Sequence, residues 1–476
     1  MKKVLSLSIV LLVLLATLSA CTAATPVEEV NEVSYDVVVI GGGAAGLAAA
    51  IEAGRAGASV VLLEKLPMLG GSTLVSGGIV YGTGFAIQKE AGIEDSVDAL
   101  VDYWMERAEG KATEAHLRFV AERSGATIDW LADIGVVFGE PYPTGSSPVA
   151  RAVSAEGRGN GLIEPLKAEA LVHGVEVLLQ TTAESLIVDS NNRIIGLLAK
   201  DSAGEALKIN ANAVVIATGG FDRSVDLVKT YAPIMEGNAS FSGVGNTGDG
   251  LSMALAVGAD VSGNNGVIGF RAVEGELAYT TPIASLMWMP WLNVNLDGKR
   301  FANEALDYML FYEELVKQRD GVTYRIFDQN TYLPALDEAV TKGSAFVADT
   351  LEDLAAQAGI DAEGLVATVE NYNTMIANGV DTEFGKNITG HQPINAPKYY
   401  AVKIVPAVLG TLSGIKVDLD SRVLDTNGNP IVGLYAAGEV ANGELYYKVY
   451  PGSGASLNMS FVFGRVAGEN AAKLAK

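Results

Sequence analysis

Two kinds of hydrophobic pattern alternate along the 476 residues of the chain. Short apolar runs rich in β-branched residues predict strands, and the first has the pattern of a strand buried on both faces of a parallel sheet. These runs lie at 35–40, 59–63, 175–180, 183–189, 194–199 and 213–217. Apolar residues at helical spacing predict helices between 96 and 131 and from 456 to about 472. We therefore expect an α/β fold.

The first strand leads directly into a glycine-rich turn. Gly41, Gly43 and Gly46 have the G-x-G-x-x-G spacing, and an alanine-rich helix begins inside the motif. The first glycine permits a tight turn, the second lets the backbone approach a pyrophosphate, and the third lets the helix pack closely on the strand. The second strand ends at Glu64, whose carboxylate can accept hydrogen bonds from a ribose. This order predicts a dinucleotide site; the alternative is a glycine turn without a ligand.

The segment before the first strand has the pattern of an export signal. Two lysines precede an apolar run at 4–18 that is too short for a comfortable membrane span. The sequence LSAC resembles a bacterial lipoprotein box, which predicts a signal peptide at 1–20 and acylation of Cys21, the only cysteine. We expect an extracytoplasmic protein that is lipid-anchored to the bacterial cell membrane, with 21–34 as a tether. The alternative is a spacer cysteine after an ordinary signal peptide.

The net charge of the chain argues against two classes of binding partner. The chain has 56 acidic and 33 basic residues, a formal charge of −23. This excess argues against nucleic-acid binding and against electrostatic docking on an anionic membrane. His116, in a predicted helix, has no histidine, cysteine or carboxylate pair at a metal-binding spacing. We expect it to lie on the surface, and no metal site is predicted.

Five motifs together are similar to those of one flavoprotein family. GGGAAGLAAA, GGST, VVIATGGF, GNTGDG and GLYAAGEV resemble the fumarate reductases and 3-ketosteroid dehydrogenases, and they span nearly all of the chain after the signal peptide. The resemblance implies FAD rather than NAD. It also implies a Rossmann-like FAD-binding domain, at 35–265 and 399–476, which an α+β capping domain at 266–398 interrupts. Two helices predicted within 348–373 are consistent with such a cap.

The resemblance places the FAD contacts in the glycine motifs and at the last helix. No residue that links FAD covalently is recognisable, so we expect non-covalent binding. The N-terminus of the last helix is expected to face the flavin pyrimidine, where its dipole stabilises charge on the reduced ring. The predicted FAD contacts are Gly41, Gly43, Ala45, Gly46, Glu64, Lys65, Gly71, Ser72, Thr73, Gly77, Gly78, Thr218, Gly219, Asp249, Glu439, Ser456 and Leu457.

The catalytic positions depart from the fumarate reductases. That branch carries a proton-donating arginine shortly after an RF-x-NE motif, and later a histidine and a carboxylate-clamping arginine. Here the motif runs from Arg300 to Glu304, Tyr308 stands where the proton donor should be, and the segment ANGELYYKVYPGSGAS lacks the other two residues. A dicarboxylate needs fixed positive charge in a closed site. We therefore do not expect fumarate to be the preferred substrate.

Tyr308 instead resembles the acid-base tyrosine of the 3-ketosteroid dehydrogenases. Those enzymes also bind the substrate ketone with a tyrosine four residues before a glycine, which implies Tyr450 and Gly454 here. Hydride transfer between flavin and the β-carbon of an enone places negative charge on the ketone oxygen, which a phenol and a backbone N–H can stabilise. Tyr81 is the candidate for their third tyrosine. The resemblance implies FAD-dependent reduction, or formation, of a C=C bond conjugated to a ketone in a bulky apolar, 3-oxosteroid-like substrate.

Two other functions stay open. In one, the chain reduces another unsaturated carboxylate, and Arg271 or Lys448 supplies the positive charge. In the other, it is a binding lipoprotein that keeps the fold without turnover. The run at 286–291 forms either an apolar wall for the substrate or cap core. The sequence has no C-x-x-C-H haem motif, so we expect electrons to be exchanged with an external, unidentified donor or acceptor.

Overall fold

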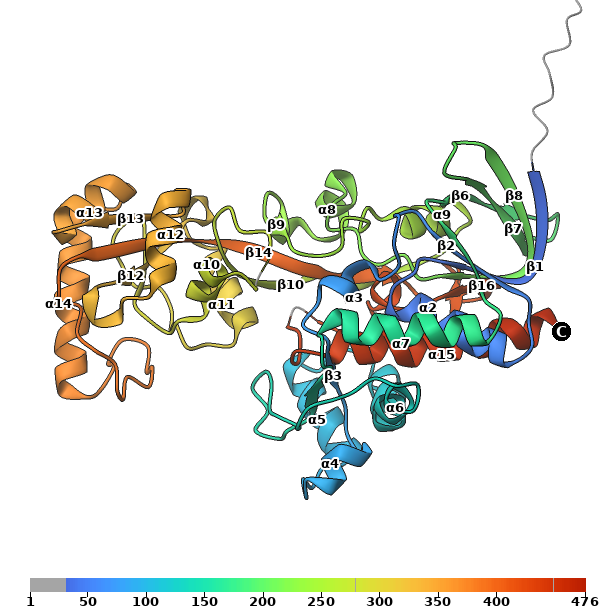
Figure 1. Ribbon diagram of the computed structural model, residues 1–476, viewed down its shortest axis with the longest axis horizontal. Coiled ribbons are helices and arrows are strands. Elements are labelled where there is room, and N and C mark those ends of the chain that lie inside the picture. Colours follow the sequence, from blue (N-terminus) through green and yellow to red (C-terminus); the bar gives the residue numbers. More distant parts are fainter. Residues whose placement is uncertain (1–30, 279, 448) are drawn as a thin grey trace, which may run out of the picture.

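The computed structural model describes residues 31–278, 280–447 and 449–476. Cys21, the predicted signal peptide and Lys448 lie outside these ranges. The chain forms an elongated molecule, in which two long strands join a layered α/β unit at one end to a second unit at the other (Figure 1). No described helix is both long enough and apolar enough to cross a membrane.

An eight-stranded sheet forms the centre of the first unit. Its main path has the order β15-β16-β8-β1-β2-β5, and β1 is parallel to both β2 and β8. The antiparallel pair β6 and β7 continues from β8. The strands are β1 (Asn31–Ile40), β2 (Val60–Glu64), β5 (Glu176–Leu179), β6 (Thr182–Val188), β7 (Ile194–Lys200), β8 (Ala206–Ile216), β15 (Arg422–Leu424) and β16 (Pro430–Ala436). All six strands predicted from the sequence are present.

The first strand begins earlier than its apolar run. Asn31 to Tyr35 pair with Leu207 to Ala211 of β8, so residues 31–34 belong to the sheet. The predicted tether over 21–34 is therefore wrong for its last four residues. This part of the strand extends beyond the core, so its residues are polar and the side chains of Asn31 and Glu32 are exposed. The apolar pattern of the sequence therefore does not predict it.

Three helices cover one face of this sheet: α2 (Ala44–Arg55), α7 (Gly159–Val172) and α15 (Ala455–Ala475) (Figure 1). The helices α2 and α15 run in the same direction and approach closely because small residues line their contact. A Cβ atom on Gly464 or Gly468 would lie only 2.5 or 2.1 Å from a backbone oxygen of α2. This packing brings the N-termini of both helices to one cavity.

A helical lobe packs beside α15 and contains α5 (Val97–Arg107) and α6 (Glu114–Asp133). His116 of α6 is buried: its Nε2 atom lies 3.1 Å from the Val417 carbonyl oxygen, and its ring stacks on Phe463. The expected surface position of His116 is therefore wrong, because α15 covers this side of α6. No group of three or more His, Cys, Asp or Glu within the described ranges could hold a metal ion. The smaller elements of this unit are α3 (Gly71–Val75), β3 (Ile79–Tyr81), α4 (Ala86–Glu90), β4 (Ala152–Ser154), α8 (Val225–Tyr231) and α9 (Asp249–Ala256).

The second unit, the cap, is built around two long antiparallel strands, β10 (Val261–Val273) and β14 (Tyr399–Ile415). Its sheet has the order β10-β14-β12-β11, with β9 and β13 also paired to β14. The remaining cap elements are β9 (Ala239–Ser240), α10 (Pro282–Ser285), β11 (Asn293–Asn295), α11 (Tyr308–Leu315), β12 (Thr323–Phe327), α12 (Pro334–Lys342), β13 (Ala345–Ala348), α13 (Leu351–Ala358) and α14 (Ala362–Asn378). The predicted boundary between 265 and 266 falls inside β10, because the long strands run through both units (Figure 1). The helices expected within 348–373 are α13 and α14.

Candidate active site

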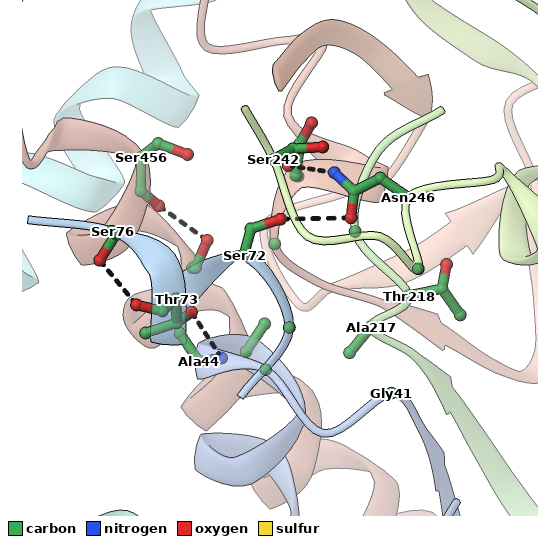
Figure 2. Close-up of a pocket in the computed structure, with 18 of the residues that line it drawn as sticks. Gly41, Ala44, Ser72, Thr73, Ser76, Ala217, Thr218, Ser242, Asn246 and Ser456 are labelled. Carbon is green, nitrogen blue, oxygen red and sulfur yellow. Dashed lines mark hydrogen bonds between the residues drawn. The ribbon is translucent and has the colours of Figure 1, made fainter. Parts of the chain in front are cut away.

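The glycine turn after β1 forms one wall of a long cavity. Gly41 has a φ of +107°, and a Cβ atom there would lie 2.3 Å from the Ala217 carbonyl oxygen. Gly43 is the N-cap residue of α2 and, as a glycine, contributes no side-chain hydrogen bond to the helix. Figure 2 shows how the turn, α3 and the end of β8 meet around this space. The cavity has a volume of about 1930 Å³, including its open mouth.

We expect Gly41→Ala to destabilise the protein by about 2–4 kcal/mol and to lower its flavin content. The new methyl group adopts an unfavourable φ and also displaces the backbone at Ala217. Gly57→Ala is the matched control, because Gly57 also has a positive φ but a Cβ atom there meets nothing within 4 Å. Melting temperature and the ratio of flavin to protein absorbance measure both effects. Equal losses in the two variants would contradict the crowding argument.

The carboxylate after β2 is held by the backbone at the rim of the turn. Glu64 accepts hydrogen bonds from the N–H groups of Gly42, at 3.0 Å, and Leu66, at 2.9 Å. The neighbouring Lys65 forms an ion pair of 2.6 Å with Asp249. These contacts fix two carboxylates and one ammonium group along the same part of the cavity.

Side chains from distant segments close the middle of the cavity. The Thr73 hydroxyl accepts a hydrogen bond from the Ala44 N–H at 3.2 Å, which ties α3 to the start of α2 (Figure 2). Ser72 Oγ lies 3.2 Å from Asn246 Oδ1. Asn246 also donates to both Asp222, at 3.1 Å, and Glu439, at 3.3 Å. Asn246 and Asp222 were not among the predicted FAD contacts, because nothing in the local pattern shows that two carboxylates share one amide.

This shared amide places two carboxylates close together. Burial and the nearby Asp222 carboxylate raise the pKa of Glu439 to about 8. This raised pKa favours the protonated form of the Glu439 carboxyl. It can donate a hydrogen bond to a hydroxyl of a bound ligand as well as accept one.

Most of the predicted FAD contacts line this cavity, and the exceptions have a structural role. Gly46 does not line it, because its Cα faces the glycine turn, where a Cβ atom would lie 1.8 Å from the Gly41 oxygen. Gly78 packs against the Arg158 backbone instead. The residues that line it are Gly41, Gly43, Ala45, Glu64, Lys65, Gly71, Ser72, Thr73, Gly77, Thr218, Gly219, Asp249, Glu439, Ser456 and Leu457.

Two tyrosines meet at the far end of the cavity. Tyr308 is the first residue of α11 in the cap, and Tyr450 precedes α15 in the other unit; both line the cavity together with Ser453 and Gly454. Burial raises the pKa of Tyr308 well above its ordinary value, and the charges of Tyr450 and Asp307 act in the same direction. The Tyr308 phenol is therefore protonated at neutral pH.

The N-terminus of α15 fixes the second phenol. The Tyr450 oxygen accepts a hydrogen bond of 2.6 Å from the Ser456 N–H. Backbone amides at this helix start lower the pKa of Tyr450, yet burial outweighs them and raises it above its ordinary value. Gly454 has a φ of +98° and caps the helix. Because the phenol oxygen already accepts from the backbone, its own proton is available as a donor to a ligand.

Other tyrosines surround this pair without lining the cavity. Tyr81, the candidate for a third active-site tyrosine, is buried and does not line it. Tyr103 of α5 donates to the Pro451 carbonyl at 2.6 Å, and Tyr446 packs 5.6 Å from the Tyr450 ring. Neither Tyr103 nor Tyr446 was predicted as part of the site: the proximity of Tyr103 depends on how α5 packs beside the start of α15, and Tyr446 is one of several tyrosines in the segment before α15.

Five apolar residues line the cavity together with the two phenols. They are Phe241, Ile268, Phe270, Trp288 and Leu409. In the run at 286–291, Leu286 and Met287 belong to the cap core, whereas Trp288 lines the cavity and makes an edge contact with Tyr308. The cap-core interpretation therefore applies to Leu286 and Met287, and a substrate wall at Trp288 stays a prediction.

Similarity to known proteins identifies the nucleotide. A family model described as "FAD binding domain" matches residues 36–457. The chain belongs to this FAD-binding family. The cofactor is FAD, as the five sequence motifs indicated.

Individual relatives agree with this assignment. The urocanate reductase of Eggerthella lenta is 33% identical, over 92% of this chain and 75% of its own length. The NADH:fumarate oxidoreductase of Klebsiella pneumoniae is 30% identical over 93% of this chain, and the chain spans 48% of its length. The structure of 3-ketosteroid Δ1-dehydrogenase from Sterolibacterium denitrificans, in complex with 1,4-androstadiene-3,17-dione, is 26% identical. It superimposes with a TM-score of 0.83 over 92% of this chain and 99% of its own.

The residues of the cavity fit FAD. The start of α2, where the N-cap residue is a glycine, offers backbone N–H groups and a positive dipole end to the pyrophosphate. Glu64 can hold a ribose, and Glu439 the hydroxyls of the ribityl chain. The Thr218 hydroxyl is buried in the described structure without a hydrogen-bond partner, which a ligand in the cavity would supply.

Proposed function

We propose that this chain is an FAD-dependent oxidoreductase that reduces, or forms, a C=C bond conjugated to a ketone in a bulky apolar, 3-oxosteroid-like substrate. The observation that carries the proposal is the pair of phenols, Tyr308 and Tyr450, which line the cavity together with apolar side chains such as Trp288. Among the described residues, the acidic and basic side chains that line the cavity are Glu64, Lys65, Asp249 and Glu439, and all four belong to the predicted FAD contacts. A neutral ketone can bind beside the two phenols without leaving an unpaired charge in the cavity.

Each phenol has a separate role in this reaction. Bound FAD supplies or accepts a hydride. In the reductive direction Tyr308, which is protonated at neutral pH, donates its proton to the α-carbon of the enone. Tyr450 donates a hydrogen bond to the ketone oxygen, where negative charge develops. The Gly454 N–H is a further candidate donor to this oxygen.

An anaerobic substrate panel tests the reaction class. The purified protein with reduced dye should oxidise the dye in the presence of cyclic and steroid enones, and fumarate should give little or no turnover. The yellow cofactor should leave the protein on acid denaturation, because we propose that it binds non-covalently. A protein purified without flavin would favour a binding lipoprotein, and fumarate as the best substrate would overturn the proposal.

A second candidate function, reduction of an unsaturated carboxylate, is favoured by two buried arginines in the cap. Arg271 of β10 and Arg325 of β12 are both buried, and neither forms an ion pair within the described residues. Arg271 Nε and Arg325 Nε and Nη2 also have no hydrogen-bond partner there. The Arg271 guanidinium lies 5.6 Å from the ring centre of Trp288, which lines the cavity. A substrate carboxylate would compensate this positive charge.

The same panel separates the two candidates if it includes matched pairs of substrates with and without a carboxylate. Burial lowers the pKa of Arg271 to about 10, so its guanidinium remains charged at neutral pH. If it binds a carboxylate, Arg271→Gln should raise KM for the acidic member of each pair and leave the neutral member unchanged. An equal change for both members would leave only the ketone proposal.

We also propose that the protein is an extracytoplasmic lipoprotein anchored through an acylated Cys21, and that it exchanges electrons with a separate donor or acceptor. The support is the lipoprotein box and the single cysteine. Cys21→Ser should move the protein from the membrane fraction to the soluble fraction and leave its flavin content unchanged. Retention of the variant in the membrane, after a salt wash, would show that another segment provides the anchor.

A further inference from the structure

Arg107, in the helical lobe, lies near the N-terminus of α11, the cap helix that begins with Tyr308. Arg107 is the last residue of α5, and its Nη2 atom lies 3.8 Å from Oδ1 of Asp307. The side chains are 13% and 9% exposed, so the pair is largely shielded from water. The two residues are 200 positions apart in sequence and belong to the two different units of the molecule. The contact therefore forms only where the lobe and the cap meet.

The geometry at Asp307 ties this contact to Tyr308. Asp307 is the N-cap of α11, and its Oδ1 atom accepts a hydrogen bond of 3.1 Å from the Met309 N–H. Tyr308 is the first residue of that helix. Arg107 therefore lies beside Asp307, the N-cap of α11, and this helix carries Tyr308, the proposed acid-base residue.

The guanidinium of Arg107 has unused hydrogen-bonding capacity. Its Nε and Nη2 atoms are buried, and neither has a hydrogen-bond partner among the described residues. At 3.8 Å the contact with Asp307 is an ion pair and is too long for a hydrogen bond. A buried cation with a single distant carboxylate is incompletely compensated, so a second negative charge nearby would be stabilised.

The proposed reaction creates such a charge. When Tyr308 gives its proton to the substrate, or before it accepts one, it is a tyrosinate in a buried site, which is unfavourable without a nearby cation. The groups whose charge or hydrogen bonding acts on Tyr308 come from three elements: Asp307 on α11, Arg107 on α5, and Tyr450 and Ser453 before α15. Tyr446 also lies close, and Arg271 of β10 acts on Asp307. Within this set, Arg107 is the cation that favours the tyrosinate.

We propose that Arg107 is a positioning residue for Tyr308: its guanidinium compensates the tyrosinate and links proton transfer to contact between the helical lobe and the cap. This inference rests on the proposed function, because it takes Tyr308 as the acid-base residue. Asp307 acts in the opposite direction, since its negative charge opposes the tyrosinate while its carboxylate holds the helix start.

The proposal predicts that two variants, Arg107→Gln and Asp307→Asn, shift the pH dependence of flavin reduction in opposite directions. In the oxidative direction, the α-carbon of a saturated ketone loses a proton to the Tyr308 oxygen, and bound FAD would accept a hydride from the β-carbon. The loss of both leaves a C=C bond between these two carbons. The rate of flavin reduction then rises with the fraction of tyrosinate. Arg107→Gln should move this alkaline limb up by about one pH unit, which slows the reaction about tenfold at a fixed pH below the limb. Asp307→Asn, which keeps the N-cap, should move the limb down.

Two further variants separate charge from structure. Arg107→Lys retains the positive charge and should restore most of the wild-type limb. Arg118→Gln is the matched control: Arg118 joins α6 to Asp98 of α5 at 2.7 Å, but it is 39% exposed and does not face Tyr308. It should leave the limb unchanged. Melting temperatures and flavin content of all variants, measured in parallel, report whether the fold is intact.

The outcomes distinguish this inference from the proposed function. A slower Arg107→Gln enzyme with an unchanged limb would show a merely structural role and overturn the inference. Limbs that move in the same direction in Arg107→Gln and Asp307→Asn would also overturn it. Near-wild-type turnover of Tyr308→Phe would instead overturn the proposed function itself, whatever the Arg107 variants show.

Discussion

Replacing Tyr308 by phenylalanine is expected to lower turnover on an enone by about 10²- to 10⁴-fold, the usual contribution of general acid catalysis. The variant keeps the ring, its edge contact with Trp288 and its packing against the two units, and loses only the hydroxyl. Since burial holds the pKa of Tyr308 well above its ordinary value, wild-type Tyr308 is a ready acid at neutral pH. Steady-state dye oxidation measures the loss, and the flavin spectrum should not change.

Tyr312→Phe is the matched control for this variant. Tyr312 lies one turn further along α11, is buried and does not line the cavity; its hydroxyl donates to the Ile234 carbonyl oxygen, at 3.4 Å, and accepts a hydrogen bond of 2.8 Å from Asn238. Removing the hydroxyl should cost about 1 kcal/mol of stability and leave turnover close to that of the wild type. If Tyr308→Phe retained near-wild-type activity, the ketone mechanism would be wrong, and Arg271 with the carboxylate-reductase hypothesis would have to be tested instead.

Local patterns were sufficient to predict the nucleotide half of the site. Gly41, Gly43 and Glu64 follow directly from a strand, a turn and a second strand that are contiguous in sequence, so their spacing carries their geometry. Short-range steric limits enforce this unit, as the close approach of Gly46 to Gly41 shows. The structure places Gly41, Gly43 and Glu64 at the cavity and Gly46 against the turn.

Contacts between distant segments could not be predicted from such patterns. Asn246 joins Asp222 to Glu439 only after β8, a loop and the segment after β16 have packed together. Arg107 reaches Asp307 only because the helical lobe lies beside the cap. Asn246 lies within the GNTGDG motif, but the motif does not show which side chains Asn246 contacts; Arg107 belongs to none of the five motifs, and a polar residue on a helix or loop has many possible neighbours.

In two places, polar residues concealed the structure that the chain adopts. Residues 31–34 pair with β8 although they are polar, because backbone hydrogen bonds need no apolar side chain. His116 is buried although it is polar, because its ring nitrogen finds a carbonyl oxygen and α15 covers it. In both cases the tertiary partner, and not the local sequence, decides the outcome.

Tyr450→Phe is expected to lower turnover by about a hundredfold, which corresponds to about 3 kcal/mol for the loss of one oxyanion donor. The variant keeps the Gly454 N–H but removes the phenol proton, and it leaves the Ser456 N–H without its acceptor. Tyr446→Phe is the matched control, because the Tyr446 ring packs 5.6 Å from Tyr450 but its hydroxyl has no hydrogen-bond partner in the described structure. That control should remain close to the wild type in turnover.

The pH dependence of flavin reduction distinguishes the roles of the two phenols. Tyr308 exchanges the proton, so its alkaline limb should disappear in Tyr308→Phe. Tyr450 only donates a hydrogen bond, so Tyr450→Phe should be slow at every pH and keep the limb. Because both phenols have raised pKa values for the same reason, burial, the position of the limb alone cannot assign it, and only its loss in one variant can. A limb that survives in Tyr308→Phe and vanishes in Tyr450→Phe would exchange the two roles.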